Sequence, residues 1–251
     1  VDKPMLSGGN INGEAGGLIA GGGAASDTII SLTTEVSIGT GADLEATTGN
    51  LTLRALNDIV ANEKVILFAA GGLSGLFGNA SIRANTDLAR VQIGDADLTS
   101  AGTIDISARG QGEIVVLVDA EAYGAGTLIT GLAEGVVRPD NQIDIASGAH
   151  LVAKGDLKLA AGTDTNFARD QYTMEVRHDS FAGSAIPLDD VDARAFLIQH
   201  NTINLHAGAV LETARTAYLH TERVGLADML AKAKAVNWVS SLTDALNGAA
   251  A

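Results

Sequence analysis

The densest group of side chains that could do chemistry lies within residues 164–200. It holds three aspartates, an arginine and two histidines: Asp189, Asp190, Asp192, Arg194, His178 and His200. Two carboxylates at a set separation can serve as the acid and the base that cleave a glycosidic bond. Neighbouring side chains of a strand point to opposite faces, so Asp190 and Asp192 can share a face that excludes Asp189. The segment is a candidate polysaccharide-processing site, but the aromatic content of 4% leaves sugar rings little to stack on and favours a solvated loop.

Residues that could bind metals or phosphates do not form a recognisable pattern. His200, His206 and His220 lack the tight spacing of a zinc site, and the chain has no cysteine. The acidic turn Gly94–Asp97 lacks the Gly-Gly-x-Gly-x-Asp calcium repeat, which leaves only incidental Ca²⁺ open there. The glycine-rich stretch Gly16–Ser26 lacks the Gly-Lys-Ser/Thr ending of a phosphate-binding loop. We expect no catalytic, cofactor-binding or metal-binding residue.

An internal repeat organises the chain. The stretch EVSIGTGADLEATTGNLTLRA, Glu35–Ala55, returns in degraded form from Arg90, Asn141 and Asn201. Its anchor positions lie 55, 52 and 60 residues apart, by subtraction along the series Val36, Val91, Ile143 and Ile203. Within each copy apolar and polar residues alternate, which is the period of a strand with one buried face. An internal period of this length indicates a repeat architecture.

Comparison of equivalent positions shows that the repeated information concerns packing. The inward column is leucine in all four copies: Leu44, Leu98, Leu151 and Leu211. The neighbouring outward column does not keep its chemistry: Asp43, Asp97, His150 and Val210. A patterned binding face would repeat outward chemistry, so the columns favour a scaffold.

These patterns predict an all-β fold, a parallel β-solenoid with a C-terminal α-helical segment. Residues 1–222 would form about four degenerate repeats, and each repeat of about 55 residues would make two or three coils. A loop or small excursion is expected within 164–197, where charged and bulky residues interrupt the repeat. Residues 223–251 would form a helical cap or a processing tail. The cap is favoured by helical spacing of apolar residues: Leu226, Met229, Leu230, Ala233 and Val236.

Composition excludes several partners. The net charge of −14 and the pI near 4.6 argue against nucleic acid and anionic membrane surfaces. The longest apolar stretch, Val65–Gly78, is 14 residues long, too short to span a bilayer, so no membrane partner is expected. The start VDKPMLSGGN has neither an initiator methionine nor a signal segment, so we expect a piece excised from a larger polypeptide.

The motif V-x-I-G-x-G-A-x-L-x-A-x-x-G-x-L-x-L-x-A is clearest at Val36–Ala55 and Ile143–Ala161. It resembles the β-helical repeats of filamentous-haemagglutinin-like proteins and leukotoxin-family filamentous adhesins of bacteria. The resemblance implies a shaft outside the cell, with no catalytic residue in the motif. The expected function is therefore a non-catalytic structural segment of an extracellular bacterial adhesin or surface or matrix filament. This rigid rod would associate with itself end to end or contact a host or matrix glycan or protein. The alternative is the polysaccharide-processing β-helix enzyme using 164–200.

Overall fold

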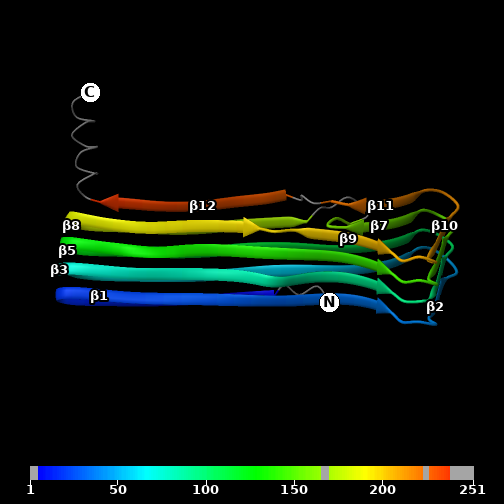
Figure 1. The fold of residues 1–251 in the computed structure, drawn as a ribbon, viewed down its shortest axis with the longest axis horizontal. Coiled ribbons are helices and arrows are strands. Elements are labelled where there is room, and N and C mark those ends of the chain that lie inside the picture. Colours follow the sequence, from blue (N-terminus) through cyan, green and yellow to red (C-terminus); the bar gives the residue numbers. More distant parts are fainter. Residues whose placement is uncertain (1–4, 165–169, 223–225, 238–251) are drawn as a thin grey trace, which may run out of the picture.

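The structure of the chain is a computed structural model that describes residues 5–164, 170–222 and 226–237. Every regular element in these ranges is a β-strand (Figure 1). The long strands are β1 (Met5–Ile38), β3 (Leu51–Ile93), β5 (Ile104–Ile145), β8 (Gln171–Leu197) and β12 (Leu226–Asn237). The short strands are β2 (Asp43–Ala46), β4 (Asp97–Ser100), β6 (His150–Ala153), β7 (Leu157–Ala161), β9 (His200–Leu205), β10 (Val210–Thr213) and β11 (Ala217–Thr221).

All strand pairs are parallel, and the repeats stack on one another. The anchor residues identified in the sequence are direct neighbours: Val36 pairs with Val91, Val91 with Ile143, and Ile143 with Ile203. The leucine column stacks in the same way in the second sheet, through β2, β4, β6 and β10. The prediction of parallel strands with a repeated inward face is confirmed.

Each repeat forms one layer, and the prediction of two or three coils per repeat is wrong. Leu51 pairs with Ile104, an offset of 53 residues, which is the length of the whole repeat. One layer contains a whole repeat because its strands are long, with 43 residues in β3 and 42 in β5. In Figure 1 the long strands lie side by side, and the short strands β2 and β10 lie at one end of them.

The strands β1, β3, β5 and β8 each fold back on themselves, whereas β12 pairs only with the first half of β8. Asn57 and Asp87 belong to the same strand β3, yet their side chains are joined by a 2.8 Å hydrogen bond. The bend coincides with Gly71 and Gly72. A Cβ at Gly71 would lie 2.4 Å from the Gly17 carbonyl oxygen, and one at Gly124 would lie 2.4 Å from that of Gly71. Glycine is needed in this column because no side chain fits between layers at the bend.

Two apolar cores lie inside the stack. One fills the space between the two halves of the folded strands and is built of small and β-branched residues such as Ile59, Val65 and Ile82. The other lies near the short strands and contains Leu98 and Ile143. These residues are fully buried, since a layer covers them on either side.

The excursion expected somewhere within 164–197 is confirmed but lies before Gln171, since Gln171–Leu197 is the strand β8. The pairing offset between layers rises from 53 residues at Ala108 and Ala161 to 60 at Gln111 and Gln171. Seven additional residues are therefore accommodated between Ala161 and Gln171. Of these connecting residues, 165–169 lie outside the described part of the chain.

The predicted C-terminal helix is wrong over Leu226–Asn237, which forms β12 and pairs with β8. In this register Met229 stacks on Met174 and Ala233 on His178. The free edge of β8 offers backbone hydrogen bonds along the whole segment, and these outweigh the helical spacing of its apolar residues. Residues 238–251 of the predicted cap lie outside the described ranges. No described segment is a helix of the length and hydropathy needed to cross a bilayer.

The leucine column provides a test of the layered core. Leu98→Ala should lower the free energy of unfolding by roughly 2–5 kcal/mol, because Leu98 is fully buried between two layers. Leu211→Ala is the matched control, since Leu211 is only partly buried in the last layer of the column and should cost less. Urea unfolding followed by circular dichroism measures both. Equal losses would contradict the described stacking.

Candidate functional site

The candidate carboxylates of the sequence lie on the second half of β8. Val191 and Ala193 pack against the core, so Asp190, Asp192 and Arg194 face outward, as the alternation predicted. Asp192 forms an ion pair with Arg194 at 2.5 Å. The carboxylate of Asp192 is therefore already engaged by a neighbouring side chain of its own strand.

Asp189 and His178 lie on inward positions of the same strand. Asp189 pairs in register with the buried Ile129, and desolvation raises its pKa above the usual value. His178 is fully buried and lies close to Gly131, where an added Cβ would approach its Nε2 to 2.6 Å. Burial lowers the pKa of His178, against a smaller opposing effect of the Gly78 carbonyl. His178 therefore faces the interior, whereas the carboxylates of Asp190 and Asp192 lie on the outer face.

Of the remaining histidines, His200, His206 and His220 each lie against one carboxylate, and His150 lies 3.6 Å from two. His200 lies 3.1 Å from Asp140, and His206 lies 2.7 Å from Asp144. Within residues 5–164, 170–222 and 226–237, no three His, Cys, Asp or Glu side chains form a group that could hold a metal ion. The histidines form separate exposed ion pairs between or within layers.

A buried polar network is the most unusual chemical feature of the described chain. It lies between the two apolar cores and consists of six polar side chains: Asn57, Asp87, Asn141, Asp170, Tyr172 and Gln199. Asp87, Asp170 and Tyr172 are at most 2% exposed. The network comes from three successive layers, so it joins segments far apart in the sequence.

Asp87 is held by two donors. The Tyr172 hydroxyl donates to Asp87 Oδ2 at 2.6 Å, and Asn57 Nδ2 donates to Asp87 Oδ1 at 2.8 Å. Desolvation raises the pKa of Asp87, and the two hydrogen bonds oppose that rise. Burial, followed by the nearby Asp87 carboxylate, raises the pKa of Tyr172 well above its usual value. Tyr172 therefore stays protonated and donates.

Asp170 accepts three hydrogen bonds. They come from the Gly110 amide at 3.0 Å, Asn141 Nδ2 at 2.8 Å and Gln199 Nε2 at 2.5 Å. Desolvation nevertheless raises the pKa of Asp170 to about 6, because its donors are neutral and Asp87 adds a like charge. The carboxyl group therefore changes its charge within the ordinary working range of pH.

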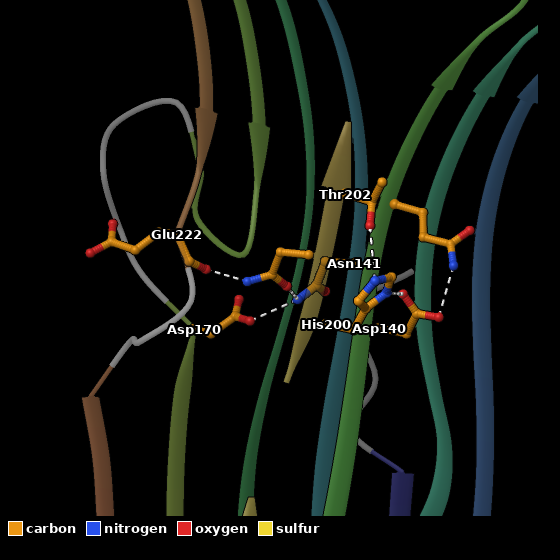
Figure 2. A network of polar contacts seen from close by, with 8 residues as sticks. Asp140, Asn141, Asp170, His200, Thr202 and Glu222 are labelled. Carbon is orange, nitrogen blue, oxygen red and sulfur yellow. Dashed lines mark hydrogen bonds and ion pairs between the residues drawn. The ribbon is translucent and has the colours of Figure 1, made fainter. Parts of the chain in front are cut away.

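An asparagine ladder carries the network toward the last layer. Asn141 Nδ2 also donates to Asn201 Oδ1 at 2.7 Å, and Asn201 Nδ2 donates to the Glu222 carbonyl oxygen. Figure 2 shows this chain of contacts, with the pair of His200 and Asp140 on the other side of the same strands. The ladder repeats along the stacking direction, as the strands do.

Burial decides what the network can do. A catalytic group must reach its substrate, but Asp87, Asn141 and Asp170 are no more than 1% exposed. The two carboxyl groups instead accept hydrogen bonds from other segments and align the segments that carry them, although the amide oxygens of Asn57 and Asn141 accept none from the part of the chain that the structure describes. The network is therefore a structural junction between layers.

Sequence reasoning missed this network, although one signal for it was present. Asn57 and Asp87 occupy inward positions, next to the buried Ala55 and Ala89, where the alternation calls for apolar residues. A polar residue at an inward position of a strand must find a buried partner. Tyr172 is 85 residues from Asp87, so the sequence did not indicate which partner that would be.

No protein-family model, no curated protein and no solved structure matches this chain.

Replacement of Asp170 tests the charge change in the network. The pKa of Asp170 is raised from 3.8 to about 6, so its favourable contribution is complete below pH 3.8 and is lost as the pH rises through 6. Between these limits the wild type should lose about 3 kcal/mol of unfolding free energy relative to Asp170→Asn, which cannot titrate. Urea unfolding at a series of pH values between 3.5 and 8 measures this difference. Asp192→Asn on the outer face is the control. If the unfolding free energy of Asp170→Asn changed with pH in parallel with that of the wild type, Asp170 would not be the group that titrates.

Removal of the tyrosine hydroxyl tests the other half of the network. Tyr172→Phe takes one donor from a buried carboxyl group and should cost about 1–3 kcal/mol of unfolding free energy. The aromatic ring stays in place, so near-ultraviolet circular dichroism should change little outside the lost phenol. Thermal unfolding monitors the loss, and Tyr218→Phe is the control because Tyr218 is 45% exposed. Equal stability of both variants would show that the hydroxyl contributes nothing.

Proposed function

We propose that the chain is a non-catalytic segment of a parallel β-solenoid rod, the shaft of an extracellular bacterial adhesin or of a surface or matrix filament. The rod would act as a rigid spacer, which holds whatever is attached to one end at a fixed distance from the other end. It would also associate end to end, because its end layers offer the same surface that its inner layers bury.

The observation that carries the proposal is one column of core residues. Leu53, Ile106, Leu159 and Leu219 pair in that order, and all four belong to the inward face. The inner members Ile106 and Leu159 are 0% and 1% exposed, whereas Leu219 in the last layer is 51% exposed. One further layer would cover Leu219 as Leu219 covers Leu159. An uncovered core position beside free strand backbone is a template for another parallel strand.

The outer faces support a structural role over a binding or catalytic one. Neighbouring outward residues change from layer to layer, as in Asp97, His150 and Glu212, where the histidine lies 3.6 Å from each carboxylate. Asp192, the carboxylate that a polysaccharide-processing enzyme would need free, is paired with Arg194. A row of identical outward side chains, which a repetitive ligand would require, is not formed by these residues.

Stiffness follows from the direction of the hydrogen bonds. Parallel pairing of β3 with β5 runs from Leu51 to Ile93, and these backbone bonds point along the stacking direction. Extension of the rod would have to break many of them together. The buried network adds side-chain bonds in the same direction, through Asn141 and Asn201.

Two further parts of the proposal rest on the repeat motif at Val36–Ala55 and Ile143–Ala161. They are the location outside a bacterial cell and the partner, a host or matrix glycan or protein. The net charge of −14 is compatible with a solvated surface filament. The proposal includes no nucleic-acid or membrane partner and no catalytic residue.

Electron microscopy of the purified chain at rising concentration tests the proposal. We expect filaments that grow along the stacking axis, and Leu219→Asp should shorten or abolish them because it places a charge on the last layer. Thr99→Asp is the matched control, since Thr99 faces outward on an inner layer, paired with Glu45 on one side and Val152 on the other, and should leave filaments unchanged. Dispersed monomers at all concentrations would overturn end-to-end association. Cleavage of an acidic polysaccharide that is lost on Asp190→Ala would overturn the non-catalytic role.

A further inference from the structure

The bends of the long strands form a surface free of charge. We name it the fold-back tip and define it as residues 15–26, 65–82, 122–133 and 180–188. These four windows contain no Asp, Glu, Lys, Arg or His. They lie in register, since Ile19 pairs with Leu73, Leu73 with Gly126, and Gly126 with Ile186. In a chain with a net charge of −14, four aligned uncharged windows make one continuous neutral edge.

Large apolar side chains protrude from this edge. Leu18 and Ile19 are 84% and 77% exposed, and Ile186 and Leu188 are 66% and 59% exposed. A shallow hollow of about 550 Å³ runs between them and is lined on the inner layers by Leu73 and Leu128. Contiguous exposed apolar surface of this kind marks an interaction site in a protein that is otherwise solvated.

Charged residues border the tip on both sides. They are mainly acidic and mark the ends of the four windows: Glu14, Asp27, Lys64, Arg83, Glu121, Glu134, Asp179 and Asp189. Arg83 is already engaged by Asp27 at 3.1 Å and Glu134 at 2.9 Å. A partner that covers the tip must therefore be apolar where it touches and must leave the acidic borders in water.

We propose that the fold-back tip binds the fold-back tip of a second copy of this chain, in a lateral, two-fold contact between stacks. An identical neutral edge meets both conditions, because two strongly acidic molecules can approach there without bringing carboxylates together. The protruding Leu18 and Ile19 supply the side chains that a hollow can receive, and Leu73 and Leu128 line that hollow. A two-fold axis makes the contact self-complementary, with each ridge over the partner's hollow.

The size of the edge predicts a weak contact that strengthens with length. Four layers spaced by about 4.8 Å give a tip roughly 20 Å long and one strand bend wide, less than a standard protein interface requires. Every additional layer lengthens the edge, so two long stacks would be joined by many weak contacts acting together. A lipid surface is less suitable, because the acidic borders would face the headgroups.

Single cysteines test the proposal in this cysteine-free chain. Leu128→Cys places a thiol on the tip of an inner layer, near the expected two-fold axis, and mild oxidation should trap a covalent dimer. Thr52→Cys is the control on an exposed side of the stack, and we expect at least tenfold less dimer from it. Leu73→Asp added to Leu128→Cys should suppress the trapped dimer, with unchanged circular dichroism showing that the double variant is folded.

Two results would overturn the lateral contact. One is equal trapping of Leu128→Cys and Thr52→Cys, and the other is flotation of the chain with phosphatidylcholine vesicles without trapped dimer. A third cysteine variant, Leu219→Cys, separates this proposal from end-to-end association. Head-to-tail stacking joins unlike surfaces and does not bring Leu219 to its own copy, so filaments without Leu128→Cys dimers would overturn the lateral contact alone.

Discussion

The hydrogen-bonded register between successive layers is the constraint on which the rest of the structure depends. β3 and β5 pair from Leu51 and Ile104 to Ile93 and Ile145, with an irregularity between Ala84 and Asp87. As long as this register holds, every inward residue lies on the inward residue of the layer below it. The core then needs only one apolar side chain per position, which is why alanine, valine, isoleucine and leucine suffice with so few aromatic residues. The additional residues between Ala161 and Gln171 are accommodated at a connection, outside the paired strands.

The same register explains where surface character changes along a layer. The outer face between Glu121 and Glu134 is uncharged because both halves of the strand approach their bend there. Close approach of backbones at the bend admits only glycine at Gly71 and Gly124, and charges are absent from the exposed positions around them. The inner part of each layer is thus devoted to stacking, and the two contacts proposed above would use the ends of the stack and its neutral edge.

Much of the fold could be predicted from the sequence, because inward positions repeat. The column of Leu44, Leu98, Leu151 and Leu211 is leucine in every repeat, and these residues do stack. The extent of a layer could not be predicted, because alternation has the same period in a short strand and in one of 43 residues. β12 was predicted as part of a helix because its larger apolar residues recur at helical spacing from Leu226 to Val236, and only the free edge of β8 decides against a helix. The buried network could not be predicted from the sequence, because only the folded chain brings Asp87 and Tyr172 together.

Alternation has a weakness that the buried network removes. A layer displaced along its neighbour by two residues keeps its apolar side chains inward, so apolar packing alone distinguishes poorly between registers. The bond of Tyr172 to Asp87 and that of Asn141 to Asp170 exist in one alignment only, because a shift would leave buried polar groups facing apolar ones. The buried network between the two cores thus defines one register among several that apolar packing alone does not distinguish. A layer displaced by two residues would forgo these buried hydrogen bonds, so the network favours one register over the neighbouring ones.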